Sequence, residues 1–249
     1  MKTTIIVPAR FASVRLPGKP LAEIGGVPMV VRVARRGLES DCGTVTVATD
    51  DARVLEACQD HSIDVVMTSA THPSGSDRVH EALGLLGFEG DAVIVLQGDL
   101  PLVDPAHVRA SLEPLKNEEC DIATLATLIG DEHEARDPNV VKIAATPLQG
   151  YGIEPGDTLR AVYFSRSVVP SGEGPLLHHI GLYAYRTKSL HRFVSLPPGG
   201  LEQRERLEQL RALENGMRID VMLVDGVPLG VDSPADLAAA RAMVEGEAA

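Results

Sequence analysis

Short runs of β-branched residues alternate with segments of helical periodicity in the first part of the chain, and this alternation constrains the fold more than any other feature. Strands alternating with helices indicate βαβ units, so we expect an α/β protein with a mainly parallel sheet. The expected strands are 3–9, 44–50, 63–68 and 92–99, and the expected helices are 28–39 with Pro28 in its first turn, 52–59, and 76–86 with Ser76 as N-cap.

From about residue 120 the rhythm changes to extended runs that follow one another, with a turn region rich in Gly and Pro at 147–157. Such runs favour a smaller mixed or antiparallel β extension, and we expect one compact α/β unit with a smaller lobe. The expected elements are strands at 122–129, 140–146, 158–166, 178–186 and 218–226, a helix at 200–216 stopped by Gly216, and a last helix at 233–247 begun by Ser233 and Pro234.

Charge and hydropathy narrow the class of partner. The chain of 249 residues has a formal net charge of -12, which disfavours a general nucleic-acid surface or an anionic membrane surface. The N-terminal apolar stretch is broken by Pro8 and Arg10, too early for a signal peptide, and the longest uncharged apolar runs fall short of the ~20 residues of a membrane span. We therefore expect a cytoplasmic protein that binds neither nucleic acid nor membrane.

The cysteines predict neither a disulfide framework nor a zinc site. Cys42, Cys58 and Cys120 are odd in number, widely spaced and lack any CxxC or Cys/His ligand pattern. We expect them to be free thiols in a reducing compartment.

The first candidate site is the stretch 5–21, IIVPARFASVRLPGKPL, where an apolar strand leads into a loop with Arg10, Arg15 and Lys19. It is not a Walker A loop, because Ser13 stands where the first glycine belongs and Pro20 follows the lysine. Ligands of parallel sheets bind at the carboxyl ends of strands, so these cations are placed to hold a polyphosphate. A solvated loop with incidental charges is the alternative.

Two aspartates are the next candidates. Asp99 follows an apolar strand in VLQGDLP, and Asp232 stands before the last helix in GVDSP. Carboxylates beside a polyphosphate loop suit Mg²⁺, which takes one or two carboxylates together with substrate phosphates. Each also has a simpler explanation, as a turn residue for Asp99 and as a helix-start carboxylate for Asp232.

A further segment, HPSGSDRV, places Gly75 and Ser76 at a helix N-terminus with Arg78 one turn in. Small residues there allow a base, a sugar or an anion to approach the backbone closely. A plain helix cap explains the segment equally well.

Taken together and in order, the motifs resemble those of the CMP-KDO synthetases, the 3-deoxy-manno-octulosonate cytidylyltransferases. The likeness spans nearly the whole chain. The motifs that carry it are VPARFASVRLPGKPL, VATD, HPSGSDR, QGDLP, DPNVVK, YFSR, HHIGLYAYR, LEQRERLEQLR and GVDSPADL.

The resemblance implies a fold, a reaction and partners. The implied fold is the Rossmann-like, three-layer nucleotide-diphospho-sugar transferase fold, in a homodimer that uses CTP and Mg²⁺ to activate an acidic eight-carbon sugar. It implies a single domain over 1–249, with a nucleotide-binding part at about 1–120, a sugar-binding and dimerisation part at about 121–220, and a return to the core at 221–249.

Site residues follow from the same likeness, position by position. Arg10 and Lys19 match the catalytic cations. The CTP-binding positions are Ala9, Arg10, Arg15, Lys19, Ser74 and Gly75, the magnesium carboxylates are Asp99 and Asp232, and the positions around the sugar acid are Arg78, Gln97, His179, Tyr183, Glu202 and Glu205.

The implied reaction is in-line attack of the sugar's anomeric hydroxyl on the α-phosphorus of CTP, with pyrophosphate leaving. No Ser/His/Asp or Cys/His arrangement stands out in the chain, which agrees with catalysis by positioning and electrostatics. The chain departs from the family at Leu100, where QGDEP is usual, in the short connection at 167–178, and at Arg204 and Arg206, where apolar residues are usual. Another acidic sugar or acceptor therefore stays open as the substrate, as does a silent nucleotide-binding homologue.

Overall fold

The chain folds into two compact units. The computed structural model describes residues 1–13, 15–148, 150 and 153–247. The first unit comprises Met1–Arg109 together with Pro228–Ala249, and the second unit comprises Ala110–Val227. The C-terminal segment thus belongs to the same unit as the N-terminal strand.

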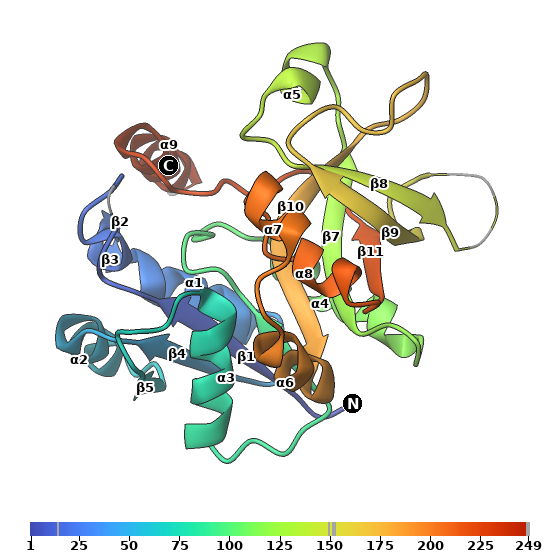
Figure 1. The fold of residues 1–249 in the computed structure, drawn as a ribbon. Coiled ribbons are helices and arrows are strands. Elements are labelled where there is room, and N and C mark those ends of the chain that lie inside the picture. Colours follow the sequence, from blue (N-terminus) through green and yellow to red (C-terminus); the bar gives the residue numbers. More distant parts are fainter. Residues whose placement is uncertain (14, 149, 151–152, 248–249) are drawn as a thin grey trace. The chain divides into compact units, whose positions relative to one another are not determined.

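The first unit is built on a parallel sheet whose strands run in the order β5-β4-β1-β6 (Figure 1). β1 lies in its interior, pairing with β4 on one side and β6 on the other. Its residues Ile5, Ile6 and Val7 are fully buried, which explains their uninterrupted apolar run. The strands are β1 (Thr3–Ala9), β4 (Thr44–Thr49), β5 (Val65–Met67) and β6 (Ala92–Val95).

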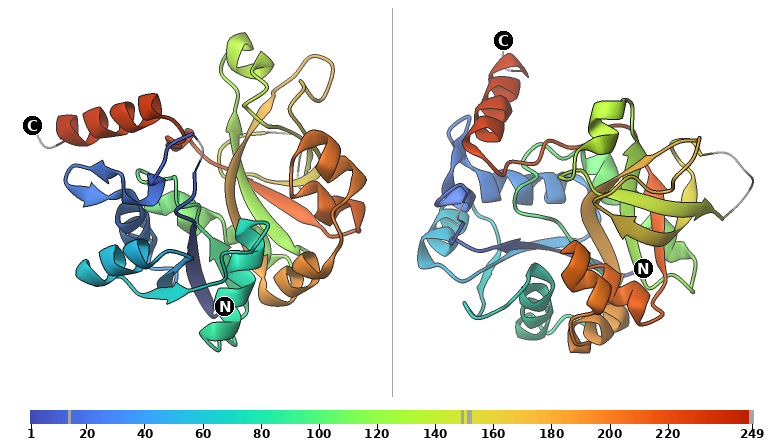
Figure 2. Two further views of the ribbon diagram at one scale, coloured as in Figure 1. Left: turned by 60° about the vertical axis from the view of Figure 1, so that its left-hand side comes forward. Right: turned by 45° about the horizontal axis from the view of Figure 1, so that its top comes forward.

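Helices α1 and α3 cover opposite faces of this sheet (Figure 2). The right-handed crossover rule accounts for this, because the chain moves outward from β1 through α1 and returns past it through α3 to β6. The other elements of this unit are the 3₁₀ turn η1 (Lys19–Leu21) and the hairpin β2 (Glu23–Ile24) and β3 (Val27–Pro28). The α-helices are α1 (Met29–Glu39), α2 (Ala52–Asp60), α3 (Gly75–Leu85), α4 (Pro105–Ala110), whose last residue belongs to the second unit, and α9 (Pro234–Glu247).

The predicted start of α3 at Ser76 is wrong. Ser74 is the N-cap, with extended backbone angles and a side-chain oxygen that accepts from the Asp77 amide, while Ser76 is buried inside the first turn. Both serines suit an N-cap by residue type, and residue type alone does not tell which of them has the extended backbone that Ser74 adopts. α1 likewise begins at Met29, with Pro28 just outside the helix.

The second unit is built on a mixed sheet whose strands run in the order β10-β7-β11-β9-β8. β7 and β11 are parallel, and the other neighbours are antiparallel. The outer strands β10 and β8 also pair with each other at His178 and Lys142, so the sheet curls toward closure. The strands are β7 (Ile122–Leu128), β8 (Lys142–Pro147), β9 (Thr158–Ser165), β10 (Leu177–Arg186) and β11 (Ile219–Leu223).

The single helix predicted at 200–216 is also wrong, because Arg206 adopts left-handed backbone angles and divides the segment in two. Gly216 does follow the second piece with a positive φ of 68°, as expected of a C-terminal stop. The helical elements of this unit are η2 (Glu113–Lys116), α5 (Glu132–Arg136), α6 (Thr187–Ser195), α7 (Gly200–Glu205) and α8 (Leu210–Glu214).

The expected α/β class, with a parallel sheet and a smaller mixed β part, is confirmed. The predicted turn region at 147–157 falls partly on residues 149, 151 and 152, outside the described residues. All the cysteines are free, and burial raises the pKa of Cys58 to about 11 and that of Cys120 to about 12, so both stay thiols at neutral pH.

Across the described ranges, no helix is both long and apolar enough to cross a membrane.

Candidate functional site

The carboxyl ends of β1 and β6 open onto a cavity of about 470 Å³ in the first unit. A Cβ atom at Gly98 would lie 3.0 Å from the Pro8 carbonyl oxygen, so glycine lets the segments after these two strands approach each other. The predicted site residues that line the cavity are Ala9, Arg10, Arg15, Lys19, Ser74, Gly75, Arg78, Gln97, Asp99 and Asp232.

Lys19 joins the two candidate aspartates. Its Nζ donates to Asp99 Oδ2 at 2.9 Å and to Asp232 Oδ1 at 2.8 Å, and its side chain is only 14% exposed. Gly18, with a φ of 69°, turns the loop into η1 and so directs Lys19 back toward the strand ends. The carboxylates therefore converge on one cation at the cavity wall.

The arginines of the loop are more open to water. Arg15 Nη2 lies 2.9 Å from Asp232 Oδ2, but the Arg15 side chain is 71% exposed, so this pair contributes little stability. Arg10 is exposed at the cavity, and within the described part of the chain no hydrogen bond or ion pair engages its side chain. Arg10 is thus available to an anionic ligand.

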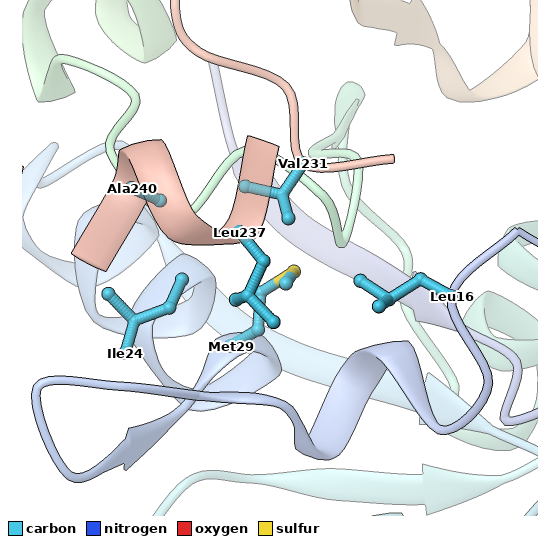
Figure 3. Close-up of a cluster of buried hydrophobic side chains, with 6 residues drawn as sticks. All are labelled: Leu16, Ile24, Met29, Val231, Leu237 and Ala240. Carbon is cyan, nitrogen blue, oxygen red and sulfur yellow. The ribbon is translucent and has the colours of Figure 1, made fainter. Parts of the chain in front are cut away.

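An apolar cluster places Asp232 beside the loop (Figure 3). Val231 and Leu237, from the C-terminal segment, pack with Leu16 and Met29, and Ile24 and Ala240 complete the cluster. Leu16 directly follows Arg15, and Val231 directly precedes Asp232, so the buried contact lies next to the exposed ion pair in both segments. The Val231 amide also donates to the Asp99 carbonyl oxygen at 2.9 Å, which ties the two aspartate segments together.

Asp236 orders the turn that carries Asp232. Its Oδ2 accepts from the amides of Asp232 and Ser233 at 3.1 and 2.8 Å and from the Ser233 hydroxyl at 2.8 Å. Burial opposes the charged form of Asp236, but these hydrogen bonds outweigh it and the pKa lies below its ordinary value. Asp236 is therefore a carboxylate cap at the start of α9.

Ser74 and Gly75 lie at the N-terminus of α3, on the opposite side of β1 from α1. The Ser74 hydroxyl donates to Asp77 Oδ2 at 2.7 Å and accepts from the Asp77 amide at 3.3 Å. The first turn of α3 is thus closed by its own serine cap, with the Gly75 backbone exposed at the cavity.

Arg78 and Gln97 reach the cavity from α3 and from the turn after β6. Arg78 is only 4% exposed, and its guanidinium donates to Asp50 Oδ2 at 2.7 Å and to Thr68 Oγ1 at 2.6 Å. Asp50 Oδ1 also accepts from the Phe11 amide at 3.3 Å, so Asp50 connects the basic loop to α3. Sequence reasoning missed this role, although Asp50 ends the strand in the VATD motif.

His179 and Tyr183 lie on β10 in the second unit. His179 Nε2 lies 3.0 Å from Thr124 Oγ1, and its ring contacts Phe164 and Tyr183. Burial lowers the pKa of His179 to about 3, with the neighbouring His178 adding to the effect, so the ring is neutral at neutral pH. Burial also raises the pKa of Tyr183 well above its ordinary value.

Glu202 and Glu205 belong to α7, and both are engaged within the second unit. Glu202 receives two hydrogen bonds from Arg211, at 2.9 and 2.6 Å, and one from the Gly199 amide at 2.8 Å. Glu205 accepts from the Ser165 hydroxyl at 3.0 Å and from the Arg166 amide at 3.1 Å. These contacts hold α7 against α8 and β9, and the sugar role of both residues stays a prediction.

Comparison with known proteins identifies the relatives of this chain. The cytidylyltransferase family model matches residues 4–219. The chain is 54% identical over 249 residues to the 3-deoxy-manno-octulosonate cytidylyltransferase of Sinorhizobium medicae, covering 99% of this chain and 97% of the relative. It is 56% identical over 242 residues to the Rhizobium meliloti protein of the same name, covering 96% and 94%.

The chain belongs to the 3-deoxy-manno-octulosonate cytidylyltransferase family.

Solved structures agree with this family. CMP:2-keto-3-deoxy-manno-octonic acid synthetase, solved as a complex with CTP, has a TM-score of 0.91 at 38% identity, covering 99% of this chain and 100% of that one. UTP-bound UGPase from Acinetobacter baumannii has a TM-score of 0.68 at 15% identity, covering 99% and 94%, and shows a shared fold alone. The expected nucleotidyltransferase fold is confirmed.

Among the positions at which this chain differs from the usual family sequence, Leu100 is the one that the structure explains best. Leu100 is 8% exposed, and a Cβ atom at Gly230 would lie 3.9 Å from its Cδ2. In place of an acidic group beside Asp99, this chain thus has an apolar contact with the segment that leads to Asp232. Arg204 and Arg206 lie at the end of α7, where Arg206 forms the left-handed turn.

The donors present fit a divalent cation that is completed by substrate. Asp99 and Asp232 supply hard carboxylate oxygens directed to one point, which Lys19 Nζ occupies in this structure. Over the residues that the structure describes, no group of at least three His, Cys, Asp and Glu side chains surrounds a potential metal position. Such a pair suits Mg²⁺, which relies on phosphate oxygens and water for its other ligands.

Proposed function

We propose that this chain transfers CMP from CTP to the anomeric hydroxyl of 3-deoxy-manno-octulosonate and releases pyrophosphate. The observation that carries the proposal is the cavity in which Lys19 is shared by Asp99 and Asp232 while Arg10 faces the same space. The relatives at 54% and 56% identity supply the identity of the acceptor.

The triphosphate has a binding surface in the basic loop. Arg10 and Lys19 supply positive charge, and Arg15 adds to it at the exposed rim. Charge-assisted hydrogen bonds from these groups to phosphate oxygens are stronger than neutral ones. A ligand with several negative charges also explains why cations gather here in a chain of net charge -12.

Asp99 and Asp232 would hold Mg²⁺ together with the substrate phosphates. When bound, the ion neutralises charge on the phosphate oxygens. The two aspartates also fix Lys19 before substrate arrives, and Asp236 orders the turn that bears Asp232. The two carboxylates and the Asp232 turn are therefore already ordered when substrate arrives.

The reaction is a displacement at phosphorus. The anomeric oxygen forms a bond to the α-phosphorus of CTP as its hydroxyl proton passes to solvent water, and the bond from that phosphorus to the bridging oxygen breaks. The electron pair leaves with pyrophosphate, whose growing negative charge Arg10 and Lys19 stabilise. Within the first unit, Arg78 and Gln97 are the proposed contacts for the acidic acceptor.

A homodimer in the cytoplasm is the proposed working form of this chain. The proposal follows the resemblance to the family. Sedimentation of the purified protein across a concentration series tests it, and a single species of about 26.5 kDa would contradict it.

Pyrophosphate release measured with CTP, MgCl₂ and a panel of ulosonic acids tests the activity. We expect release with 3-deoxy-manno-octulosonate. Release with a different acid alone would retain the chemistry and replace the substrate, whereas CTP binding without release for any acid would indicate a silent homologue. A parallel series with and without EDTA tests the metal, and equal rates in both would contradict it.

A further inference from the structure

His72 lines the nucleotide cavity, and the proposed reaction gives it no role. It lies in the loop between β5 and α3, two residues before the Ser74 cap. Its side chain is 20% exposed, so the ring is mostly enclosed while part of it stays accessible.

Glu81 holds one side of this ring. Glu81 Oε2 is hydrogen-bonded to His72 Nε2 and also accepts from the Ser69 amide at 2.8 Å. Bonding to His72, and then to Ser69, lowers the pKa of Glu81, so its side chain is a carboxylate at neutral pH. An ionised carboxylate only accepts hydrogen bonds, which places a proton on Nε2.

Nδ1 is consequently the polar ring atom that remains for a ligand. Across the described residues, no hydrogen bond engages Nδ1 of His72. In the neutral ring this nitrogen is an acceptor, because a carboxylate on one nitrogen sets the tautomer of the other. A cytidine nucleotide offers matching donors in its ribose hydroxyls and its exocyclic amine.

The segment that carries His72 is fixed at both ends. Glu81 ties the ring and the Ser69 amide to the second turn of α3, and the Ser74 cap closes the first turn. The nearby positive charge of Arg78 adds to the stabilisation of the Glu81 carboxylate. A ring held in this way loses little conformational entropy on meeting a ligand.

We propose that His72 Nδ1 accepts a hydrogen bond from the bound nucleotide and that Glu81 is the positioning residue that orients the ring. The proposal rests on the proposed function, because it takes CTP as the ligand of the cavity.

Replacing His72 by asparagine or by glutamine distinguishes a direct contact of Nδ1 with the nucleotide from a purely structural role of the ring. The amide of asparagine reaches the position of Nδ1, and that of glutamine reaches the position of Nε2. CTP affinity of the full-length protein is measured by calorimetry without acceptor. We expect His72→Ala and His72→Gln to weaken CTP binding by about fivefold to tenfold, the loss of one hydrogen bond, and His72→Asn to stay within about threefold of wild type.

Glu81 is tested in the same assay. We expect Glu81→Ala to weaken CTP binding by about fivefold and Glu81→Gln, which keeps an acceptor oxygen for the ring, to have a smaller effect. The kcat of His72→Ala at saturating substrate should stay within about threefold of wild type, because the contact serves binding. His133→Ala, which alters an exposed histidine of the second unit, is the matched control and should leave CTP affinity unchanged.

Two further ligands identify the donor. If the base amine is the donor, His72→Ala weakens CTP but not UTP, and if a ribose hydroxyl is the donor, it weakens both but not 2′,3′-dideoxy-CTP. Equal CTP affinity for wild type and folded His72→Ala overturns the proposal, and so does retention of affinity in His72→Gln with loss in His72→Asn. Failure of the wild type itself to bind CTP would instead contradict the proposed function.

Discussion

Lys19 shares its ammonium between Asp99 and Asp232, and this sharing links phosphate binding to metal binding at the level of single atoms. A cation that enters between the carboxylates must displace Nζ, and the displaced ammonium then becomes available to a phosphate. If the proposed function holds, Asp99 Oδ2 and Asp232 Oδ1 thus form ion pairs with Lys19 before substrate binds and hold the metal afterwards.

Replacing either aspartate should therefore affect turnover far more than folding. We expect Asp99→Asn and Asp232→Asn each to lower kcat for pyrophosphate release by about 100-fold or more. Thermal stability should change little, because both carboxylates are partly exposed. Full activity in both variants would show that the metal assignment is wrong, and Glu39→Gln, at an exposed pair far along α1, provides the control.

Asp50 should matter for folding as well as for the loop. Its partner Arg78 is 4% exposed, so Asp50→Asn leaves a buried guanidinium without its carboxylate. We expect a loss of about 3 kcal/mol in the free energy of unfolding, measured by urea titration. A loss below about 0.5 kcal/mol, the value for exposed pairs, would show that the Asp50 contact is not a buried one.

The hydrogen-bonded carboxylate of Glu202 should make the stability of the second unit depend on pH. Burial favours its neutral form, but hydrogen bonds from Arg211 and Gly199 prevail and lower its pKa below the ordinary value of a glutamate. The carboxylate binds a proton less readily in the folded chain than in the unfolded chain. Its contribution to stability is therefore present above about pH 4.5 and is lost as the pH falls through the lowered pKa.

Glu202→Gln should consequently lower stability at pH 7 by about 2 kcal/mol and flatten the decline of stability in acid. Urea titrations at pH 7, 5 and 3.5 measure both effects. The control is Glu132→Gln, whose carboxylate is 76% exposed in its pair with Arg136. Unchanged stability at pH 7 would indicate that Glu202 serves only a ligand.

At the scale of elements, α9 couples the two ends of the chain through its apolar side chains. Leu237 and Ala240 on α9 pack with Leu16 and Met29, which flank η1 and its Lys19. The helix therefore supports the basic loop and the Asp232 turn at once.

Shortening Leu237 tests this coupling. We expect Leu237→Ala to lower the free energy of unfolding by about 2–3 kcal/mol through loss of apolar burial and an imperfectly filled cavity. It should also raise the MgCl₂ concentration that gives half-maximal activity, because Asp232 loses its support. Met243→Ala alters a 50% exposed side chain on the same helix and should leave both values unchanged; equal effects in the two variants would contradict a specific role for Leu237.

Element boundaries show where local patterns suffice. The strands 3–9 and 44–50 were predictable because continuous β-branched runs leave no competing helix. The break at Arg206 could not be predicted, because glutamate and arginine are good helix formers and residues 201–209 contain no glycine or proline. Hydrogen bonds that Glu205 accepts from the Ser165 hydroxyl and the Arg166 amide hold α7 in place, and local propensity carries no information about such contacts.

At the scale of the whole molecule, a strongly acidic chain brings Arg10, Arg15 and Lys19 together at one cavity of the first unit. Long-range repulsion from a net charge of -12 would oppose binding of a polyanion, and the local cations reverse this at the strand ends. The chain's return at Pro228 brings Asp232 into the same unit as Lys19.

Residue types and their order along the chain were enough to predict the α/β class, most strands and the cations and carboxylates of the cavity. They were enough because hydrophobic periodicity and strand-end positions are local properties of the chain. The sharing of Lys19 by two aspartates 133 residues apart in the chain, the burial of Asp50 with Arg78, and the orientation of His72 by Glu81 were decided by tertiary packing alone. Each depends on distances between segments that only the folded chain brings together.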